Sequence, residues 1–381
     1  MPVNVPQEVL DIKKMVRSFV RKEIFPIECE IDAKAKIPDH LIEKFKEMGF
    51  YGITIGKEYG GLGLGTLGYC LLLEELGEAN GGIRTHIHLN NSIGSQAIEI
   101  DGSEEQKKKY LPGLASGEKI ACFGLTEPNA GSDAAAMETT AVKDGNEWVI
   151  NGTKHFITNG PTADVCTLMA LTDREKRARG GVTTFIVEKG TPGFSVGQIH
   201  DAMGGHGSHQ SELIFDDCRV PEENVIGEVG QGFTTAMKTL DGGRLTLSAA
   251  ALGMAQRALD LAVKYAKERV QFGKPIATKQ AIQFMLADMA TGIHAARTMI
   301  YDCAERYDNG ENITKEAAMI KLYTSEMAWK VADQSLQIHG GMGYMKECPI
   351  ERIYRDVRTM RIVEGTSEIQ RIIISRAVLK D

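Results

Sequence analysis

The sequence lacks several features that would each indicate a particular class of protein. It has no apolar stretch long enough to span a bilayer, and its amino terminus carries acidic residues instead of the apolar run of a signal peptide. Its seven cysteines are scattered singly, with no CxxC pair and no histidine and cysteine spacing typical of a metal site. We therefore expect a cytoplasmic protein with reduced thiols, no membrane insertion and no bound metal.

An excess of basic residues is also missing. The formal net charge is −7, which argues against a broad surface for nucleic acid, although a local basic pocket for an anionic ligand is compatible with it. The 381 residues are 43% hydrophobic and 25% charged, as in ordinary globular proteins. The chain is thus long enough for two or three domains with a sizeable core.

The period of the apolar residues changes twice along the chain. In residues 1–118 apolar positions recur every three or four residues, as in VLDIKKMVRSFV, which predicts a helical domain. In residues 119–228 short runs such as VTTFIVEK and SELIFDDCRV predict a β domain. In residues 229–381 the helical period returns in long alanine-rich segments, which predict a helical bundle. The expected fold class is α+β.

Glycines and charges between these runs predict turns. Asp144-Gly145 and Asn151-Gly152 are dipeptides typical of hairpin turns. The segment EYGGLGLG at 58–65 follows a helical pattern and has no βαβ unit around it, so we interpret it as a turn and not as a dinucleotide site. The basic segment DREKRARG at 173–180 lies between two β runs and is interpreted as a solvated hairpin tip.

The segment FGLTEPNAGSD at 123–133 is the strongest functional signal. Its small residues let backbone N–H groups approach a flat or phosphorylated ligand, although by itself it predicts only a turn. It is followed by GTKHFITNG, ERVQFGKPI, QIHGGMGY and VEGTSEIQR. These five segments, in this order, resemble the acyl-CoA dehydrogenase family over essentially the whole chain. The resemblance implies an N-terminal helical domain, a middle β-barrel-like domain and a C-terminal four-helix bundle.

The resemblance also implies FAD as the cofactor. In the family the segments around the first two motifs enclose the isoalloxazine ring. Family members usually have tryptophan where this chain has Phe156, which keeps the stacking and loses an indole N–H contact. The corresponding flavin-binding residues here are Phe123, Leu125, Thr126, Gly131, Ser132, Phe156 and Thr158.

Other flavin contacts in the family come from a second subunit. The resemblance therefore implies that the chain does not work as a monomer, and the family norm is a homotetramer, a dimer of dimers built on the C-terminal bundle. Electrons then pass to electron-transfer flavoprotein. The matching positions are Arg269, Phe272 and Gln280, then Gln337, Gly340 and Gly341. Separately, Thr366 and Glu368 match positions on the adenosine side of the flavin.

Glu364 matches the catalytic base of the family. This base removes the α-proton of an acyl thioester while the β-hydrogen leaves as hydride to the flavin, and the backbone N–H of the base helps to polarise the thioester carbonyl. Some relatives carry the base at the position of Gly243, and glycine cannot serve. A glutamate at a helix N-terminus can also be structural. The expected substrate-binding residues are Arg84, His88, Ser132, Asp241, Arg244 and Gly365.

Arg84 bears on the choice of substrate. It matches the arginine with which glutaryl-CoA dehydrogenases hold the distal carboxylate, because a buried arginine needs an anion; a salt bridge to a protein carboxylate is the alternative. Decarboxylating members have tyrosine just before the base and glutamate seven residues before the arginine, where this chain has Val363 and Gly77. We expect oxidation of glutaryl-CoA to stop at glutaconyl-CoA.

Several alternatives stay open at this point. The substrate can instead be benzylsuccinyl-CoA or a cyclic or short-chain acyl-CoA, because Arg84 reports a carboxylate but not the chain that carries it. The sequence is also compatible with O2 as the electron acceptor. A relative that binds acyl-CoA or flavin without catalysis is the alternative from another functional class, and the intact Glu364 argues against it.

Overall fold

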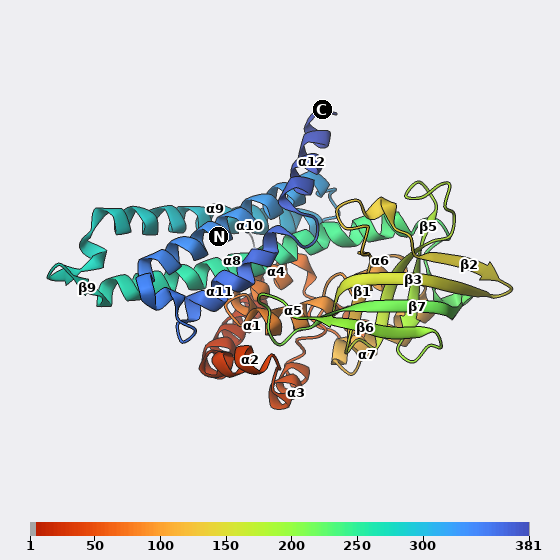
Figure 1. Cartoon of the computed structure of the whole chain (residues 1–381), viewed down its shortest axis with the longest axis horizontal. Helices are drawn as coiled ribbons and strands as arrows, with labels where there is room; N and C mark the ends of the chain where they lie inside the picture. The colour runs from red at the N-terminus through yellow and green to blue at the C-terminus, as the bar shows by residue number, and fades with distance from the viewer. Residues whose placement is uncertain (1–4, 381) are drawn as a thin grey trace.

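The computed structural model describes residues 5–380 and divides them into two helical regions and a sheet (Figure 1). The first region is helical up to residue 116, as predicted. Ser103 and Gln106 form a reciprocal capping box that starts its last helix. Its helices are α1 (Gln7–Phe19), α2 (Glu28–Lys34), α3 (Asp39–Glu47), α4 (Gly65–Leu76), α5 (Gly81–Asn90), α6 (Gln96–Asp101) and α7 (Glu104–Ser116), with a π-helical turn at Val20–Ile24 and short 3-10 turns at Phe25–Ile27 and Lys57–Tyr59.

The middle region is one mixed eight-stranded sheet. Its order is β6-β7-β3-β2-β4-β5-β8, and β1 pairs in parallel with β4. The charged segment at 173–180 joins the antiparallel strands β4 and β5, so its interpretation as a hairpin tip is confirmed. The strands are β1 (Ala121–Gly124), β2 (Thr140–Asp144), β3 (Glu147–Thr158), β4 (Val165–Leu171), β5 (Val182–Glu188), β6 (Phe194–His200), β7 (Gln210–Pro221) and β8 (Val225–Ile226), with 3-10 turns at Ala134–Ala136 and Glu222–Asn224.

One predicted turn is wrong. Asp144-Gly145 does end β2 before β3, but Asn151-Gly152 lies inside β3, where the register with β7 shifts. The Asn151 side chain exchanges two hydrogen bonds with Asp217 of β7, at 3.0 and 2.8 Å. Gly152 has φ +151°, and a Cβ there would lie 2.4 Å from Oγ1 of Thr139. The glycine therefore marks a β-bulge under a close backbone approach.

The last region is a long helical bundle that reaches away from the sheet. Helix α8 (Gly232–Glu268) starts beside the sheet and ends at a remote tip formed by β9 (Val270–Gln271) and β10 (Lys274–Pro275) (Figure 1). The return helices are α9 (Gln280–Asp308) and α10 (Thr314–His339), followed by α11 (Pro349–Arg358) and the projecting α12 (Ser367–Val378). Short 3-10 turns lie at Ile276–Thr278, Gly340–Tyr344 and Thr359–Arg361.

Small residues bring α4 and α8 into close contact. A Cβ on Gly253 of α8 would lie 2.1 Å from the carbonyl oxygen of Glu74, and one on Gly77 would lie 2.3 Å from that of Ala250. Neither glycine can be replaced by a larger residue unless the helix backbones move apart. Backbone contact between α4 and α8 therefore fixes how closely the first and last regions approach each other at this point.

The architecture confirms the predicted α+β class, with helical first and last parts and a sheet between them. Residues 58–65 form the turn that leads into α4, as interpreted from the sequence. Among residues 5–380, no helix is both long and apolar enough to cross a membrane.

Candidate active site

Glu364 stands on a left-handed turn between α11 and α12. Its φ is +53°, and Gly365 follows with φ +91°. Side chains from two helices hold the carbonyl oxygens of this turn. Nε2 of Gln370 donates to the oxygens of Glu364 and Gly365 at 3.1 and 2.9 Å, and Nζ of Lys321 donates to that of Gly365 at 2.7 Å. The non-glycine left-handed conformation is strained, so these bonds fix a backbone that would otherwise relax.

Lys321 is an unusual member of this set because it is almost fully buried. Burial is the largest cause that lowers the pKa of Lys321, to about 8, against the opposing attraction of Glu364. The same helix, α10, carries Glu326, which accepts hydrogen bonds from Ser367 at 2.7 Å and Arg361 at 2.9 Å. Helix α10 thus contacts the turn through Lys321 and the residues on either side of it through Glu326.

Arg244 approaches the turn from α8. Its Nε lies 3.5 Å from the carbonyl oxygen of Glu364, and its Nη1 donates to Asp241 at 2.5 Å. Thr314 donates to the other oxygen of Asp241 at 2.6 Å. The predicted residues Asp241, Arg244, Glu364 and Gly365 are therefore brought together by the structure.

The carboxyl group of Glu364 is enclosed, with its side chain 7% exposed. Oε2 has no hydrogen-bond partner, and a Cβ on Gly243 would lie 2.6 Å from it. The two positions at which the family carries its base therefore face each other here, and a side chain at 243 would displace the carboxylate. Oε2 is an unpaired acceptor beside α8, as expected of a group that takes a proton from a ligand.

His88 of α5 faces the other carboxylate oxygen. Its Nε2 lies 3.9 Å from Oε1 of Glu364 and 3.1 Å from Oγ of Ser92, and its Nδ1 lies 2.9 Å from the hydroxyl of Tyr69. Burial is the largest cause that lowers the pKa of His88, so the ring is neutral near pH 7. His88 therefore lies against the base itself.

Arg84 lies one helical turn before His88 on α5 and is only 4% exposed. Its Nε has no hydrogen-bond partner, and within residues 5–380 its guanidinium has no carboxylate at ion-pair distance. The first negative group that acts on it electrostatically is Asp356, which already accepts the backbone N–H groups of Gly81 at 2.9 Å and Gly205 at 2.6 Å. Burial lowers the pKa of Arg84. Arg84 is thus a buried donor without a direct anion.

The predicted flavin-binding residues of the β domain gather at the ends of β1 and β3. The N–H of His155 donates to the carbonyl of Thr126 at 2.8 Å, which ties the two segments together. Phe156 has φ +57° and is 61% exposed, and a Cβ on Gly131 would meet open space. An exposed aromatic ring beside an open glycine-containing loop fits a flat ligand with a phosphate tail, so these residues suit FAD.

A buried ion pair that the sequence analysis missed supports this loop. Nζ of Lys154 lies 2.7 Å from Oε1 of Glu127 and 3.2 Å from the carbonyl oxygen of Leu125. The Glu127 carboxylate also accepts the N–H groups of Glu138 and Thr139, at 2.5 and 3.0 Å. The motif glutamate is therefore structural. The sequence gives only a weak signal for this pair, namely a glutamate in the first motif and a lysine within the strand pattern of the second.

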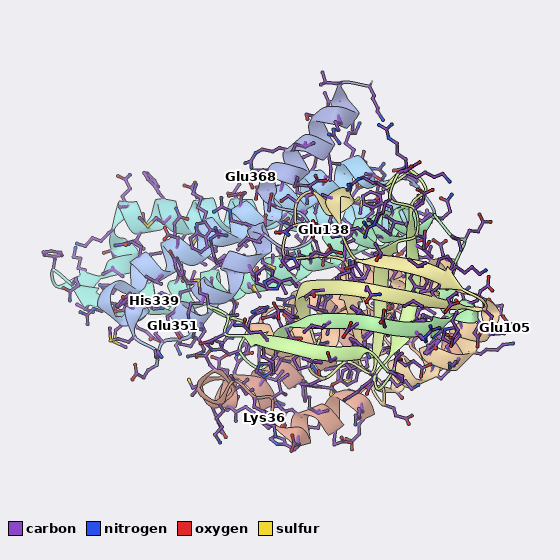
Figure 2. All side chains as sticks on the ribbon, turned by 45° about the vertical axis from the view of Figure 1, so that its right-hand side comes forward. Lys36, Glu105, Glu138, His339, Glu351 and Glu368 are labelled. Atoms are coloured by element: carbon purple, nitrogen blue, oxygen red, sulfur yellow. The ribbon has the colours of Figure 1, made fainter. Side chains whose placement is uncertain are left out.

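The predicted flavin residues of the last region lie in different places relative to the β domain. Arg269, Phe272 and Gln280 surround the remote tip, where Phe272 is 93% exposed (Figure 1). Figure 2 labels His339, which precedes Gly340, on the part of the bundle remote from the sheet, and Glu368 at the start of α12. Thr366 caps α12 through its side chain, which accepts the N–H of Ile369. The structure of one chain thus keeps the residues of the tip away from β1 and β3 (Figure 1).

Comparison with known proteins accounts for these features. Three family models match: "Acyl-CoA dehydrogenase, N-terminal domain" at residues 6–118, "Acyl-CoA dehydrogenase, middle domain" at 122–218 and "Acyl-CoA dehydrogenase, C-terminal domain" at 230–379. The chain belongs to the acyl-CoA dehydrogenase family. It is a flavin-dependent oxidoreductase, and its cofactor is FAD.

Two curated relatives illustrate the range of reactions in this family. The "Acryloyl-CoA reductase (NADH)" of Anaerotignum propionicum is 48% identical over 100% of this chain and 96% of its own length. The "Acyl-CoA dehydrogenase, short-chain specific" of Clostridium acetobutylicum is 43% identical over the whole of both chains.

Two solved structures are also similar over nearly their whole length. A chain from the "Electron transferring flavoprotein of Acidaminococcus fermentans" study is 46% identical with a TM-score of 0.97, covering 100% of both chains. The "glutaryl-coenzyme A dehydrogenase glutaryl-CoA complex" is 36% identical with a TM-score of 0.95, covering 100% of this chain and 97% of the other. The chain is thus similar to a glutaryl-CoA enzyme, but it is not more similar to that enzyme than to relatives that act on other substrates.

The buried pair yields a stability prediction. Lys154→Met leaves the Glu127 carboxylate buried without its counter-charge, so we expect the free energy of unfolding to fall by about 3 to 5 kcal/mol. Denaturant unfolding followed by fluorescence measures this loss. The double variant Lys154→Met/Glu127→Gln removes the unpaired charge and should recover part of it, and a Lys154→Met protein as stable as the wild type would contradict the structural role.

Proposed function

We propose that Glu364 is the catalytic base of an acyl-CoA dehydrogenase reaction in this chain. The observation that carries the proposal is the unpaired Oε2 of an enclosed carboxylate beside Gly243. Oε2 takes the α-proton of an acyl thioester, and the backbone N–H of Glu364 polarises the thioester carbonyl. FAD, when bound, accepts the β-hydrogen as hydride. Lys321 and Gln370 keep the base at its place by holding the carbonyls of the turn.

Glu364→Gln tests the base. The amide keeps the size of the side chain but does not accept the proton, so the rate of flavin reduction by substrate should fall by about a hundredfold to ten-thousandfold while substrate binding is retained. Anaerobic stopped-flow absorbance measures the rate, and the exposed Glu347→Gln serves as the matched control. Near-normal reduction in the Glu364→Gln protein would assign the base elsewhere.

We propose that the site is completed by a second copy of the chain. The exposed tip with Arg269, Phe272 and Gln280 supports this, because its residues match flavin-binding positions yet lie far from the β domain of their own chain. Gln337, Gly340, Gly341, Thr366 and Glu368 are assigned to the same shared flavin site. A homotetramer, as a dimer of dimers, satisfies this arrangement. The expected electron acceptor is electron-transfer flavoprotein, which the similarity to the Acidaminococcus fermentans chain supports, and the expected location is the cytoplasm.

Arg269→Ala tests the shared site. Loss of a guanidinium that reaches the partner's FAD should weaken flavin retention, and dilution should release flavin as the assembly dissociates. Flavin content after dialysis and sedimentation velocity measure the two effects, with the exposed Lys267→Ala in the last turn of α8, just before Arg269, as control. A stable monomer that keeps its full complement of FAD would rule out this arrangement.

We propose a short dicarboxylyl-CoA, with glutaryl-CoA as the best candidate, as the substrate. Support comes from Arg84, a buried guanidinium without a direct anion on the helix that also carries His88. A distal carboxylate would give it the partner that a buried charge requires. The alternatives are benzylsuccinyl-CoA, whose acyl group also carries a carboxylate, and cyclic acyl-CoA thioesters.

A neutral short-chain acyl-CoA is the second candidate, and two observations favour it. Asp356 acts electrostatically on Arg84 and can balance its charge without a ligand. The curated relatives described above act on short-chain or acryloyl thioesters. In this case Arg84 is structural and the acyl pocket is neutral.

We further propose that oxidation of glutaryl-CoA proceeds without loss of CO2. Position 77 supports this, because a Cβ there would lie 2.3 Å from a backbone oxygen of α8 and leaves no room for a glutamate. Val363, directly before the base, supplies no hydroxyl. The groups expected to assist departure of CO2 and reprotonation of the product are absent from these two positions.

Arg84→Ala separates the two substrate classes. If the guanidinium pairs with a distal carboxylate, the variant should lose about 2 to 5 kcal/mol of transition-state stabilisation with glutaryl-CoA and retain its kcat/KM with butyryl-CoA. Arg84→Lys keeps the charge without the planar fork and should fall between them. Equal losses on both substrates would show that Arg84 is structural. Mass spectrometry of the wild-type product should find a five-carbon enoyl thioester, and crotonyl-CoA as the main product would overturn the proposal that CO2 is retained.

A further inference from the structure

His88 has contacts that a residue lining the acyl chain would not need. It is almost fully buried on α5, its ring stacks on Tyr69 of α4 at a centroid distance of 5.9 Å, and both ring nitrogens face polar atoms. One of these polar atoms is Oε1 of Glu364, at 3.9 Å from Nε2. The other carboxylate oxygen, Oε2, has no partner. The two oxygens of the base are therefore in different surroundings.

The contacts of Tyr69 determine which nitrogen of His88 carries the proton. The Tyr69 side chain is fully buried, and its hydroxyl has one hydrogen-bond partner among residues 5–380, which is Nδ1 of His88 at 2.9 Å. A buried hydroxyl needs an acceptor, so Tyr69 donates to Nδ1. A neutral imidazole has one N–H group, which must then be on Nε2, facing Ser92 and Glu364.

We propose that His88 is a positioning residue for the base: its Nε2–H donates to Oγ of Ser92 at 3.1 Å and lies 3.9 Å from Oε1 of Glu364, so the positive end of this N–H group stabilises charge on Oε1 and leaves Oε2 as the oxygen that takes the α-proton. This inference rests on the proposed function of Glu364. In the reaction the α C–H bond breaks, its proton bonds to Oε2, its electron pair forms the new double bond, and the β-hydrogen leaves with its pair to the flavin.

The surroundings of His88 are consistent with a neutral donor. The charged groups that act on it are Glu364, across the acyl site, and Arg84, one turn earlier on its own helix, and Tyr69 of α4 packs against its ring. Arg84 and burial oppose a charge on the ring, and Glu364 favours one. A neutral ring acts on the carboxylate only through the dipole of its N–H group and forms no ion pair with it.

Replacement of the imidazole tests this role. His88→Leu removes this N–H group from the surroundings of Oε1, and we expect flavin reduction by substrate to slow by about tenfold. The Kd of a CoA thioester that cannot be oxidised should stay unchanged.

Two further variants separate positioning from general disruption. His88→Gln places an amide N–H near the position of Nε2 and should recover most of the rate. His86→Gln is the matched control on the same helix, because His86 bonds the hydroxyl of Tyr51 at 2.8 Å instead. Unchanged kinetics in His88→Leu, or equal losses in the Leu and Gln variants, would overturn the proposal.

A spectroscopic measurement keeps the inference separate from the proposed activity. Solid-state 15N NMR of the holoenzyme labelled at histidine, compared with His88→Gln, should give a neutral ring protonated at Nε2 between pH 6 and 8. A ring protonated at Nδ1, or a cation, would overturn the assignment even if the enzyme is active. If no acyl-CoA reduces the wild-type flavin, the proposed function fails, and the tautomer is still decided by this spectrum.

Discussion

The left-handed turn at Glu364 is the constraint on which the rest of the site depends. A φ of +53° is strained for a residue with a side chain, although the following glycine adopts its positive φ freely, and three side chains bind the carbonyls of the turn. One of them, Lys321, is buried, and its ammonium loses hydration to take part. The Glu364 carboxylate is thus placed by side chains of α8, α10 and α12 that bind the backbone of the turn, and not by contacts of its own side chain.

Close helix packing supplies the complementary half of this arrangement. Gly243 leaves room for the carboxylate on α8, and Gly77 lets α4 approach the same helix at backbone distance. Because protein interiors are close-packed, a larger residue at either position would move a wall of the site and not merely fill a gap. Gly243 therefore decides where the Glu364 carboxylate can lie, and Gly77 excludes a glutamate from position 77.

Much of this arrangement was predictable from the sequence. The change from helical to alternating period predicted the order of regions. The resemblance to the family predicted that Asp241 and Arg244 would lie with Glu364, which is 120 residues from Arg244 in the chain. The prediction failed at Asn151-Gly152, where a turn dipeptide is a bulge because β3 continues to pair with β7 beyond it. Local turn chemistry cannot report that distant pairing.

The buried lysines explain why the rest was not predictable. Lys154 and Lys321 look in sequence like surface residues of a strand and a helix, and lysine is rarely buried unless it is paired. Their partners, a carboxylate 27 residues away and a carbonyl 44 residues away, are determined only by the fold. The same holds for His88, whose role depends on a tyrosine of another helix.

Arg84 links this arrangement to the choice of substrate. Asp356 is the first and Glu364 a further carboxylate that acts electrostatically on its buried guanidinium, but among residues 5–380 neither forms an ion pair with it. Burial of a guanidinium without a direct anion costs free energy, because the charge loses its hydration. A distal carboxylate on a bound thioester would offset part of this cost, whereas a neutral acyl chain would leave it in place. The same residue therefore favours one class of thioester over the other.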